Sequence, residues 1–155
     1  MQGSFYRNKF KSIEEAQNMT LNSSFGFMLA KAAQKIADIT HESLTPLQLD
    51  IRQVGLLITI KKYEPVTQTR ISKLLRIDRT TMVALIDDLE NRGLVVRTES
   101  PQDRRVNNLT LTAKGTEILD QAWKKILESE EIVLQGLSTA EKQSLIKILE
   151  KITGY

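Results

Sequence analysis

The sequence has no cysteine and only one histidine, His41, among its 155 residues. The absence of cysteine excludes disulfide scaffolds, thiolate metal sites and cysteine-based redox sensing. One histidine leaves little for a metal site, and no glycine-rich loop that would hold phosphate groups is present. No set of nucleophile, base and orienting group is recognisable, so we expect no enzyme, no cofactor and no metal ion.

Long apolar runs are missing as well. One of the longest, residues 54–60, contains Gly55 and Thr59 and is far shorter than the ~20 residues that span a bilayer. The N-terminal residues lack the apolar core of a secretory signal peptide. A chain of this length fits one domain. These features predict a compact cytoplasmic protein with no membrane partner.

The net charge is only +3, but the charges are unevenly distributed. Residues 61–105 hold ten basic and seven acidic side chains, and so carry the whole excess. Residues 113–155 hold six basic and seven acidic side chains and show no bias toward anions. A surface that binds an anionic partner is therefore expected within residues 61–105.

Helical spacing of apolar residues and capping signals predict a mostly helical chain. Thr45 followed by Pro46 predicts one helix start, and Thr67, Asp78 and Ser138 predict others. Gly93 predicts a helix end. The expected helices cover residues 21–42, 46–62, 68–75, 79–92, 114–135 and 138 onward, and the expected strands cover Leu94–Glu99 and Val106–Thr112.

The order of the central elements is informative. A short helix, a turn at Arg76 to Asp78, a longer helix and two strands form a winged helix-turn-helix, whose second helix commonly enters a major groove. On that helix one face has the spacing of buried residues, namely Met82, Leu85, Ile86 and Leu89. The opposite face, beside Arg79, carries Thr80, Val83, Ala84, Asp87 and Asn91.

From Thr45 to Gly115 the sequence resembles the MarR family of bacterial transcription regulators. Asp103, Arg105, Leu111 and Thr112 match the family pattern D-x-R-x-x-x-x-x-L-T, which Lys114 and Gly115 follow. Supporting matches are the segments 44–48, 77–81 and 89–94 and Arg97. The resemblance implies a mostly α fold with a small two-stranded β wing, in which a winged helix-turn-helix is joined to terminal helices that form a dimerisation region.

The resemblance also implies an organisation and a function. Residues 1–44 are an N-terminal segment with a dimerisation helix, 45–112 the DNA-binding domain and 113–155 C-terminal dimerisation helices, all within one compact chain. The implied function is a sequence-specific transcriptional regulator, a repressor, that binds double-stranded DNA at a palindromic operator as a homodimer. The alternative is a winged helix that docks another protein and does not bind DNA.

Family members often release DNA when a small aromatic acid or phenol binds between the dimerisation helices and the winged domain. A ligand of this class is therefore an implied partner. The candidate lining residues are better explained as plain hydrophobic core, so we assign none of them to a ligand site: Phe25, Phe27, Leu56, Leu57 and Trp123.

The implied DNA-binding residues lie in the turn, the second helix and the wing: Arg76, Arg79, Thr80, Thr81, Val83, Ala84, Arg97, Asp103, Arg104 and Arg105. In the family the arginine at the wing tip, which is Arg105 in this chain, enters a minor groove and the acid two residues earlier holds it. Arg104 either contacts a phosphate or is solvated. Arg97 either pairs with Asp103 or contacts a phosphate.

Three positions depart from the family pattern. Val83 and Ala84 stand where polar or basic base-reading residues are common, and they offer only apolar contact to thymine methyl groups. Arg76 stands where glycine is frequent, so a left-handed backbone at this position would cost on the order of 1 kcal/mol.

Overall fold

The computed structural model describes residues 24–99 and 107–154. The chain divides after Ala37 into two units, which are described separately. Helix α3 (Phe25–Leu44) begins in the first unit and ends in the second. In the first unit its large apolar side chains Phe25, Met28 and Leu29 are all exposed.

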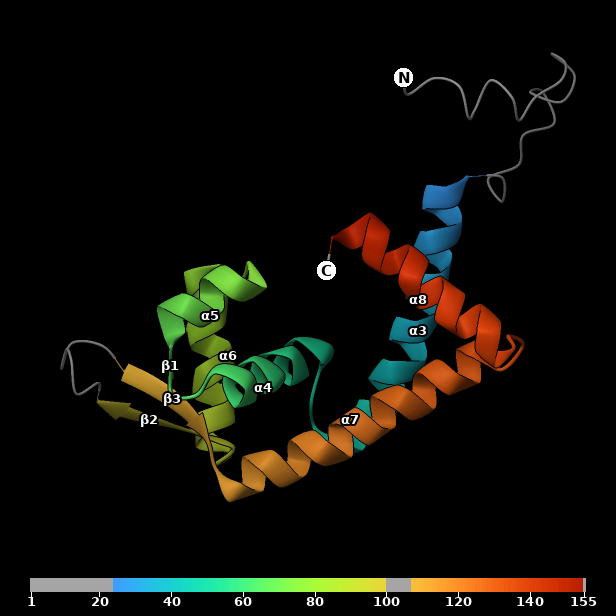
Figure 1. Ribbon diagram of the computed structural model, residues 1–155. Coiled ribbons are helices and arrows are strands. Elements are labelled where there is room, and N and C mark those ends of the chain that lie inside the picture. Colours follow the sequence, from blue (N-terminus) through green and yellow to red (C-terminus); the bar gives the residue numbers. More distant parts are fainter. Residues whose placement is uncertain (1–23, 100–106, 155) are drawn as a thin grey trace, which may run out of the picture. The chain divides into compact units, whose positions relative to one another are not determined.

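The second unit contains the winged helix-turn-helix and the C-terminal helices, in the order that the sequence predicts (Figure 1). The mostly helical class and the winged arrangement are therefore confirmed. The elements are η2 (Thr45–Leu47), α4 (Ile51–Tyr63), β1 (Val66–Thr67), α5 (Gln68–Leu75), α6 (Arg79–Asn91), β2 (Val95–Glu99), β3 (Asn107–Leu111), α7 (Ala113–Leu134) and α8 (Thr139–Thr153).

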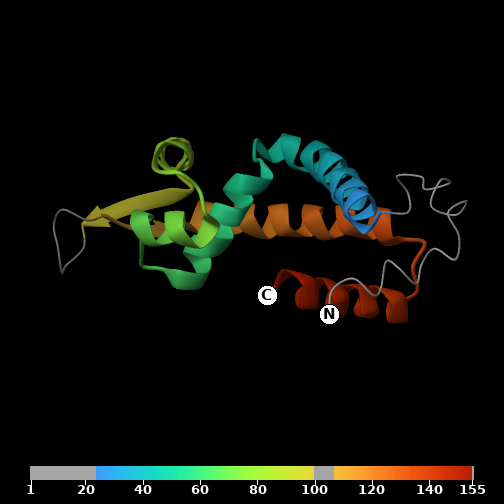
Figure 2. The ribbon, with the colours of Figure 1, turned by 90° about the horizontal axis from the view of Figure 1, so that it is seen from above.

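The sheet has three strands, not the two that were predicted. Strand β2, the olive arrow in Figure 2, pairs antiparallel with β3, from Val95 opposite Leu111 to Glu99 opposite Asn107. The third strand, β1, pairs with the other edge of β3 and places Val66 opposite Leu109. Both of these side chains are buried. A two-residue strand has no periodicity to detect, which explains why the sequence pattern missed it.

The core of the second unit lies between α4, α5, α6 and the sheet, and α7 covers part of it. The predicted buried face of α6 is confirmed, because Met82, Ile86 and Leu89 are completely buried and Leu85 is 9% exposed. Burial of this face leaves the opposite face of α6 in solvent.

The predicted helix start at Thr45 and Pro46 is wrong. Residues 45–47 form a single 3₁₀ turn, Gln48 adopts a left-handed conformation with φ 53°, and α4 begins only at Ile51. Asp50 caps α4: its carboxylate accepts from the Gln53 amide at 2.9 Å, and the Gln53 side chain accepts from the Asp50 amide at 2.9 Å. This reciprocal pair satisfies two backbone N–H groups, whereas the Thr45 hydroxyl instead donates to the His41 carbonyl of α3.

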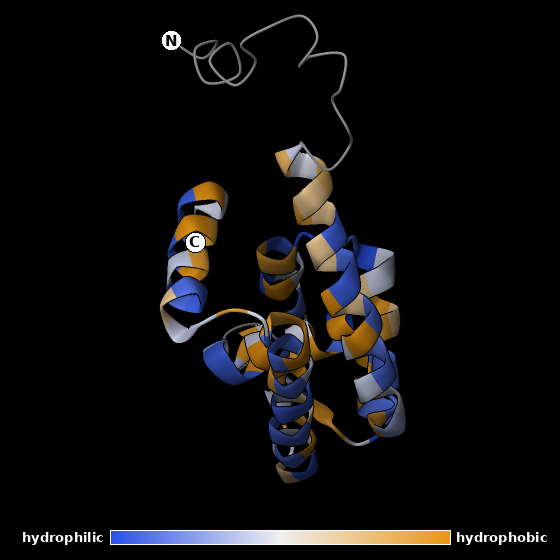
Figure 3. Cartoon of the chain, turned by 90° about the vertical axis from the view of Figure 1, so that its right-hand side faces the viewer, coloured by the Kyte–Doolittle hydropathy of each residue, from blue (hydrophilic) through white to orange (hydrophobic). Residues whose placement is uncertain are grey.

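The C-terminal helices carry apolar side chains that the second unit does not bury. None of the 15 residues of α8 is buried, and the exposed apolar positions of α7 and α8 include Trp123, Leu127, Ile132, Ile146, Ile148 and Ile152. Figure 3 shows hydrophobic residues along α8. Within the described ranges, no helix is long and apolar enough to cross a membrane.

Candidate nucleic-acid interface

The turn between α5 and α6 is built as the sequence predicts. Thr67 caps α5 by accepting from the Arg70 amide at 3.3 Å, and Asp78 caps α6 by accepting from the Thr81 amide at 2.9 Å. Arg76 has the left-handed backbone expected at this position, with φ 52°, and its side chain is exposed. A non-glycine residue therefore carries the strain at the corner of the turn.

The Asp78 carboxylate stays ionised at the start of α6. Hydrogen bonds from the Thr81 hydroxyl and amide hold the pKa of Asp78 below its ordinary value. A negative charge next to the helix N-terminus stabilises the helix through its dipole. Thr81, which is half-buried, is thus engaged in the cap.

The exposed face of α6 gathers several of the predicted site residues. Arg79, Thr80, Val83 and Ala84 are all exposed, and Asp87 follows them on the same face. Val83 is 37% exposed. An exposed helix face of this length, next to an arginine-bearing turn, has the dimensions and chemistry that suit a DNA groove.

Arg97 contacts two carboxylates that no local sequence pattern indicates. Its guanidinium, on β2, donates to the carboxylates of Asp87 and Glu90 on α6, and its backbone amide donates to Glu90 at 3.2 Å. Burial lowers the pKa of Arg97, but the hydrogen bond to Asp87 and the charges of Glu90 and Asp87 outweigh it and raise the pKa above the ordinary value. The wing is thereby attached to α6.

A second arginine, Arg92, also fixes the C-terminal end of α6. It donates to the carbonyls of Gln48 at 2.7 Å and Leu47 at 2.9 Å and pairs with Asp88 at 3.4 Å. Asp88 also accepts from the Gln53 side chain at 2.7 Å. Apart from the Arg92–Asp88 pair, which joins residues four positions apart, these contacts link residues 35 to 45 positions apart, so no local pattern could have revealed them.

The tip of the wing, with Asp103, Arg104 and Arg105, lies outside the described residues. Its roles in DNA contact therefore stay predictions. The described part of the wing is its base, the ladder that ends with Glu99 opposite Asn107.

The last part of the family pattern forms a close junction between the wing and α7. The Thr112 hydroxyl donates to the Gly93 carbonyl at 2.7 Å and accepts from the Gly115 amide at 2.9 Å. Lys114 donates to the Arg92 carbonyl at 2.9 Å. A Cβ atom at Gly115 would lie 1.9 Å from the Leu94 carbonyl oxygen, so only glycine fits.

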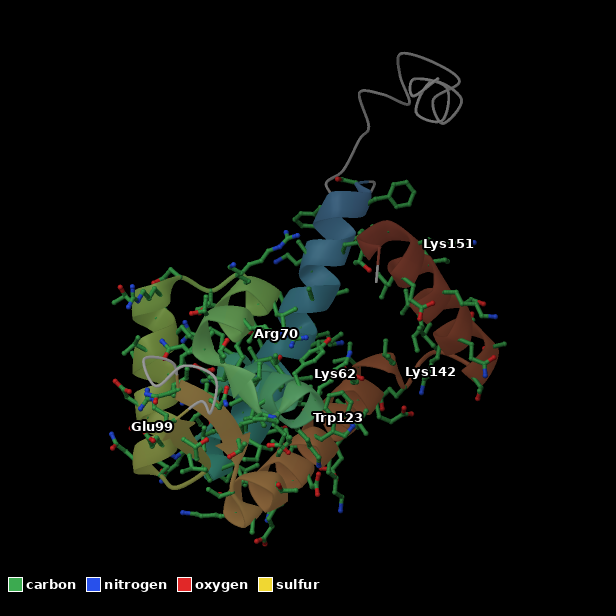
Figure 4. The ribbon with its side chains drawn as sticks, turned by 60° about the vertical axis from the view of Figure 1, so that its left-hand side comes forward. Lys62, Arg70, Glu99, Trp123, Lys142 and Lys151 are labelled. Carbon is green, nitrogen blue, oxygen red and sulfur yellow. The ribbon has the colours of Figure 1, made fainter. Side chains whose placement is uncertain are left out.

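A cavity of ≈ 320 Å³ lies between α4 and α7, and Figure 4 labels two residues of its lining, Lys62 and Trp123. Of the five ligand-site candidates, Trp123 lines the cavity, whereas Leu56 and Leu57 are completely buried in the core. The full lining is Ile58, Lys61, Lys62, Leu119, Asp120 and Trp123. It combines an apolar wall with two lysines, one of which, Lys61, pairs with Asp120 at 3.1 Å.

Comparison with known proteins identifies relatives of this chain. The profile of the MarR family matches residues 47–106. A protein of Thauera aromatica, named as a transcriptional regulatory protein for the hcr operon, is 30% identical over 113 residues. That match covers 73% of this chain and 65% of the relative, so the chain spans less than two thirds of the relative's length.

Several regulators of known structure share the fold. The transcriptional repressor CouR, solved with a 23-mer DNA duplex, is 33% identical with a TM-score of 0.78, and the match covers 86% of this chain and 94% of that chain. CouR from Rhodococcus jostii RHA1, solved with p-coumaroyl-CoA, is 26% identical with a TM-score of 0.74, and the match covers 87% of this chain and 95% of that chain.

A cysteine-to-serine variant of MarR from E. coli, solved with operator DNA, is 25% identical with a TM-score of 0.72, and the match covers 82% of this chain and 91% of that chain. The family profile, the sequence relatives and the common fold agree with the α5–α6 turn and the wing described above. The chain belongs to the MarR family, whose members are non-enzymatic DNA-binding transcription factors.

Proposed function

We propose that the protein is a repressor that binds a palindromic DNA operator as a homodimer. The observation that carries this proposal is the exposed face of α6, with Arg79, Thr80, Val83 and Ala84 on the side opposite the buried core. The DNA complexes of CouR and of E. coli MarR support it. The apolar side chains of Val83 and Ala84 would contact thymine methyl groups, and Arg79 would donate hydrogen bonds to the DNA.

The proposal of a homodimer rests on apolar side chains that the described part of the chain leaves exposed. Residues 1–44 and 113–155 flank the winged domain, and their described helices expose a row of large apolar side chains. A second copy of the chain would cover these side chains and place two α6 helices on one face of DNA. The winged domain, residues 45–112, would then contact one half-site in each protomer.

The experiment that tests this function is a gel shift on random-sequence duplexes in a salt series, followed by selection of the bound sequences. We expect binding that weakens with salt, and a selected palindrome whose half-sites lie about 10 base pairs apart. A protein-docking module, the alternative reading of the winged helix, would give no shift at any salt concentration.

Arg105→Ala is expected to reduce specific affinity by roughly 1 to 3 kcal/mol, mostly on sites with A/T flanks. The reason is that an arginine inserted into a narrow minor groove reads the strong negative potential found there. Titration of A/T-flanked and G/C-flanked duplexes measures the effect. A phosphate contact would instead weaken all sequences about equally and lower the salt slope by ~1 for each site.

Asp103→Ala is the companion variant, because the two models of the wing tip predict opposite signs. If Asp103 orients Arg105, its removal weakens binding; if it only repels phosphates, its removal strengthens binding. We expect weakening. Tighter binding by a variant with an unchanged circular dichroism spectrum would rule out the orienting role.

We also propose that the cavity between α4 and α7 takes an aromatic carboxylate whose binding releases DNA. Lys62, together with Lys61 once it leaves Asp120, would meet the carboxylate, and Trp123 would meet the ring. Trp123 is the only tryptophan in the sequence, so its fluorescence reports this site alone. We expect aromatic acids to quench the Trp123 fluorescence. The matching neutral amides should bind about tenfold more weakly. Quenching by both forms equally would contradict the role of the lysines.

A further inference from the structure

The proposed DNA-facing side of α6 carries an electrostatic problem. Asp87 follows Thr80, Val83 and Ala84 on the exposed face, and Glu90 lies one turn further along the helix. Two carboxylates close to phosphate groups would repel DNA. If α6 is to enter a DNA groove, the carboxylates of Asp87 and Glu90 must therefore be paired with a cation or point away from the phosphates.

Arg97 supplies that neutralisation from the wing. Its guanidinium donates to both carboxylates, and its side chain is only 21% exposed. The backbone amide of the same residue donates to Glu90 as well. One residue at the centre of β2 thus makes three contacts with two residues of α6.

The contacts also fix the orientation of the wing. Arg97 lies opposite Leu109 in the β2–β3 ladder, and Leu109 is completely buried in the core. The β2–β3 ladder is therefore fixed to the core at Leu109 and to α6 at Arg97, the residue opposite. The planar guanidinium fork is well suited to this task, because it holds two carboxylates in a fixed geometry.

We infer that Arg97 is a positioning residue, which locks the wing to α6 through Asp87 and Glu90 so that both elements can engage DNA together, and that it does not itself contact DNA. The inference rests on the DNA-binding function proposed above. A phosphate contact by Arg97 would require its guanidinium to leave both carboxylates, and these would then face the phosphates unpaired.

Variants with opposite changes in charge separate the two roles. Arg97→Met removes one positive charge, whereas Asp87→Asn combined with Glu90→Gln removes two negative charges. For a positioning residue, both variants weaken the same lock, since Asn and Gln keep an acceptor oxygen but lose the charge. Both then lower the ratio of specific to non-specific affinity by about tenfold, which is the size of one good charge-assisted contact. For a phosphate contact, Arg97→Met weakens binding, whereas the double variant frees the guanidinium and strengthens it.

The slope of log affinity against log salt gives a second readout. We expect Arg97→Met to leave the slope unchanged, because a residue that does not touch phosphate releases no counterion. Loss of ~1 in the slope would assign Arg97 to a phosphate. Arg97→Lys restores the charge but not the fork, so only partial recovery of the specificity ratio is expected.

Amide hydrogen exchange of the free protein tests the lock independently of DNA. Faster exchange in β2 and β3 is expected for Arg97→Met and for the Asp87 and Glu90 double variant. Arg52→Met is the matched control, because it breaks an exposed arginine–aspartate pair with Asp50 at 2.9 Å on α4. It should leave both exchange and DNA binding unchanged.

The outcomes distinguish this inference from the proposed function. If the unmodified protein binds no DNA, the proposed function fails, while faster exchange in the variants still supports the lock between wing and α6. If the double variant binds its operator more tightly, with a steeper salt slope and unchanged exchange, Arg97 is a DNA contact and the positioning role is wrong.

Discussion

Gly115→Ala is expected to destabilise the folded protein by about 3 kcal/mol or more, at the upper end of what overpacking costs. Alanine normally stabilises a helix by up to about 1 kcal/mol relative to glycine, and Gly115 lies in the first turn of α7. The expected sign is opposite because the new methyl group would lie 1.9 Å from the Leu94 carbonyl oxygen.

Neither side of this contact can move without breaking other bonds. The Leu94 carbonyl accepts from the Thr112 amide at 3.1 Å and from the Thr112 hydroxyl at 3.3 Å. The Gly115 amide donates to the same hydroxyl. Displacing α7 would therefore break the cap of the helix and the base of the wing together.

Gly55→Ala is the matched control, because Gly55 lies inside α4 and no described atom beyond its own helix lies within 4 Å of a Cβ at that position. We expect it to stabilise the protein by about 0.5 to 1 kcal/mol. Urea unfolding followed by circular dichroism measures both variants. Equal stability of Gly115→Ala and the unmodified protein would show that the junction yields easily, contrary to the geometry.

Local signals in the sequence predicted local features of the fold well. The caps at Thr67, Asp78 and Ser138 and the buried face of α6 are all confirmed. Each depends on neighbours within one or two helical turns, which a single sequence displays. The start of α4 was wrong because Asp50 and Gln53 form a stronger reciprocal cap than the Thr45–Pro46 signal.

Contacts between distant residues could not be predicted in the same way. The pairing of Arg97 with Asp87 and Glu90 depends on the angle between β2 and α6, which no local pattern encodes. Likewise, the sequence placed Gly115 in a family pattern, but the reason for glycine appears only where α7 meets the Leu94 carbonyl. For the candidate site, the sequence therefore indicated the exposed residues of α6. It did not indicate the ion pairs between Arg97 and the two acidic residues that attach the wing to this helix.

Substitution of Ile148 and Ile152 together by lysine is expected to convert the proposed dimer into a monomer of 17.6 kDa. The two side chains lie one turn apart on α8 and are 54% and 63% exposed. Because the described part of the second unit buries no residue of α8, this apolar row is available to a second copy of the chain. Two lysines in that interface would have to lose their hydration, which opposes association.

The effect on DNA binding should be larger than the loss of a few contacts. In a dimer the second half-site is bound at a high effective concentration, which raises overall affinity by about 10² to 10⁴. The double variant is therefore expected to bind a palindromic duplex that much more weakly, while its affinity for a single half-site stays unchanged. Sedimentation at micromolar concentration measures the mass, and duplexes with one or two half-sites measure the affinity.

The control for this experiment adds the same charge to the polar side of the same helix. Gln143→Lys combined with Glu150→Gln also raises the net charge by two, and both residues are exposed. This variant should remain a dimer and bind the palindrome at least as well as the unmodified protein, because added positive charge favours DNA. If the unmodified protein sediments at 17.6 kDa and the apolar double variant binds the palindrome equally well, the exposed row on α8 serves some purpose other than joining two copies of the chain.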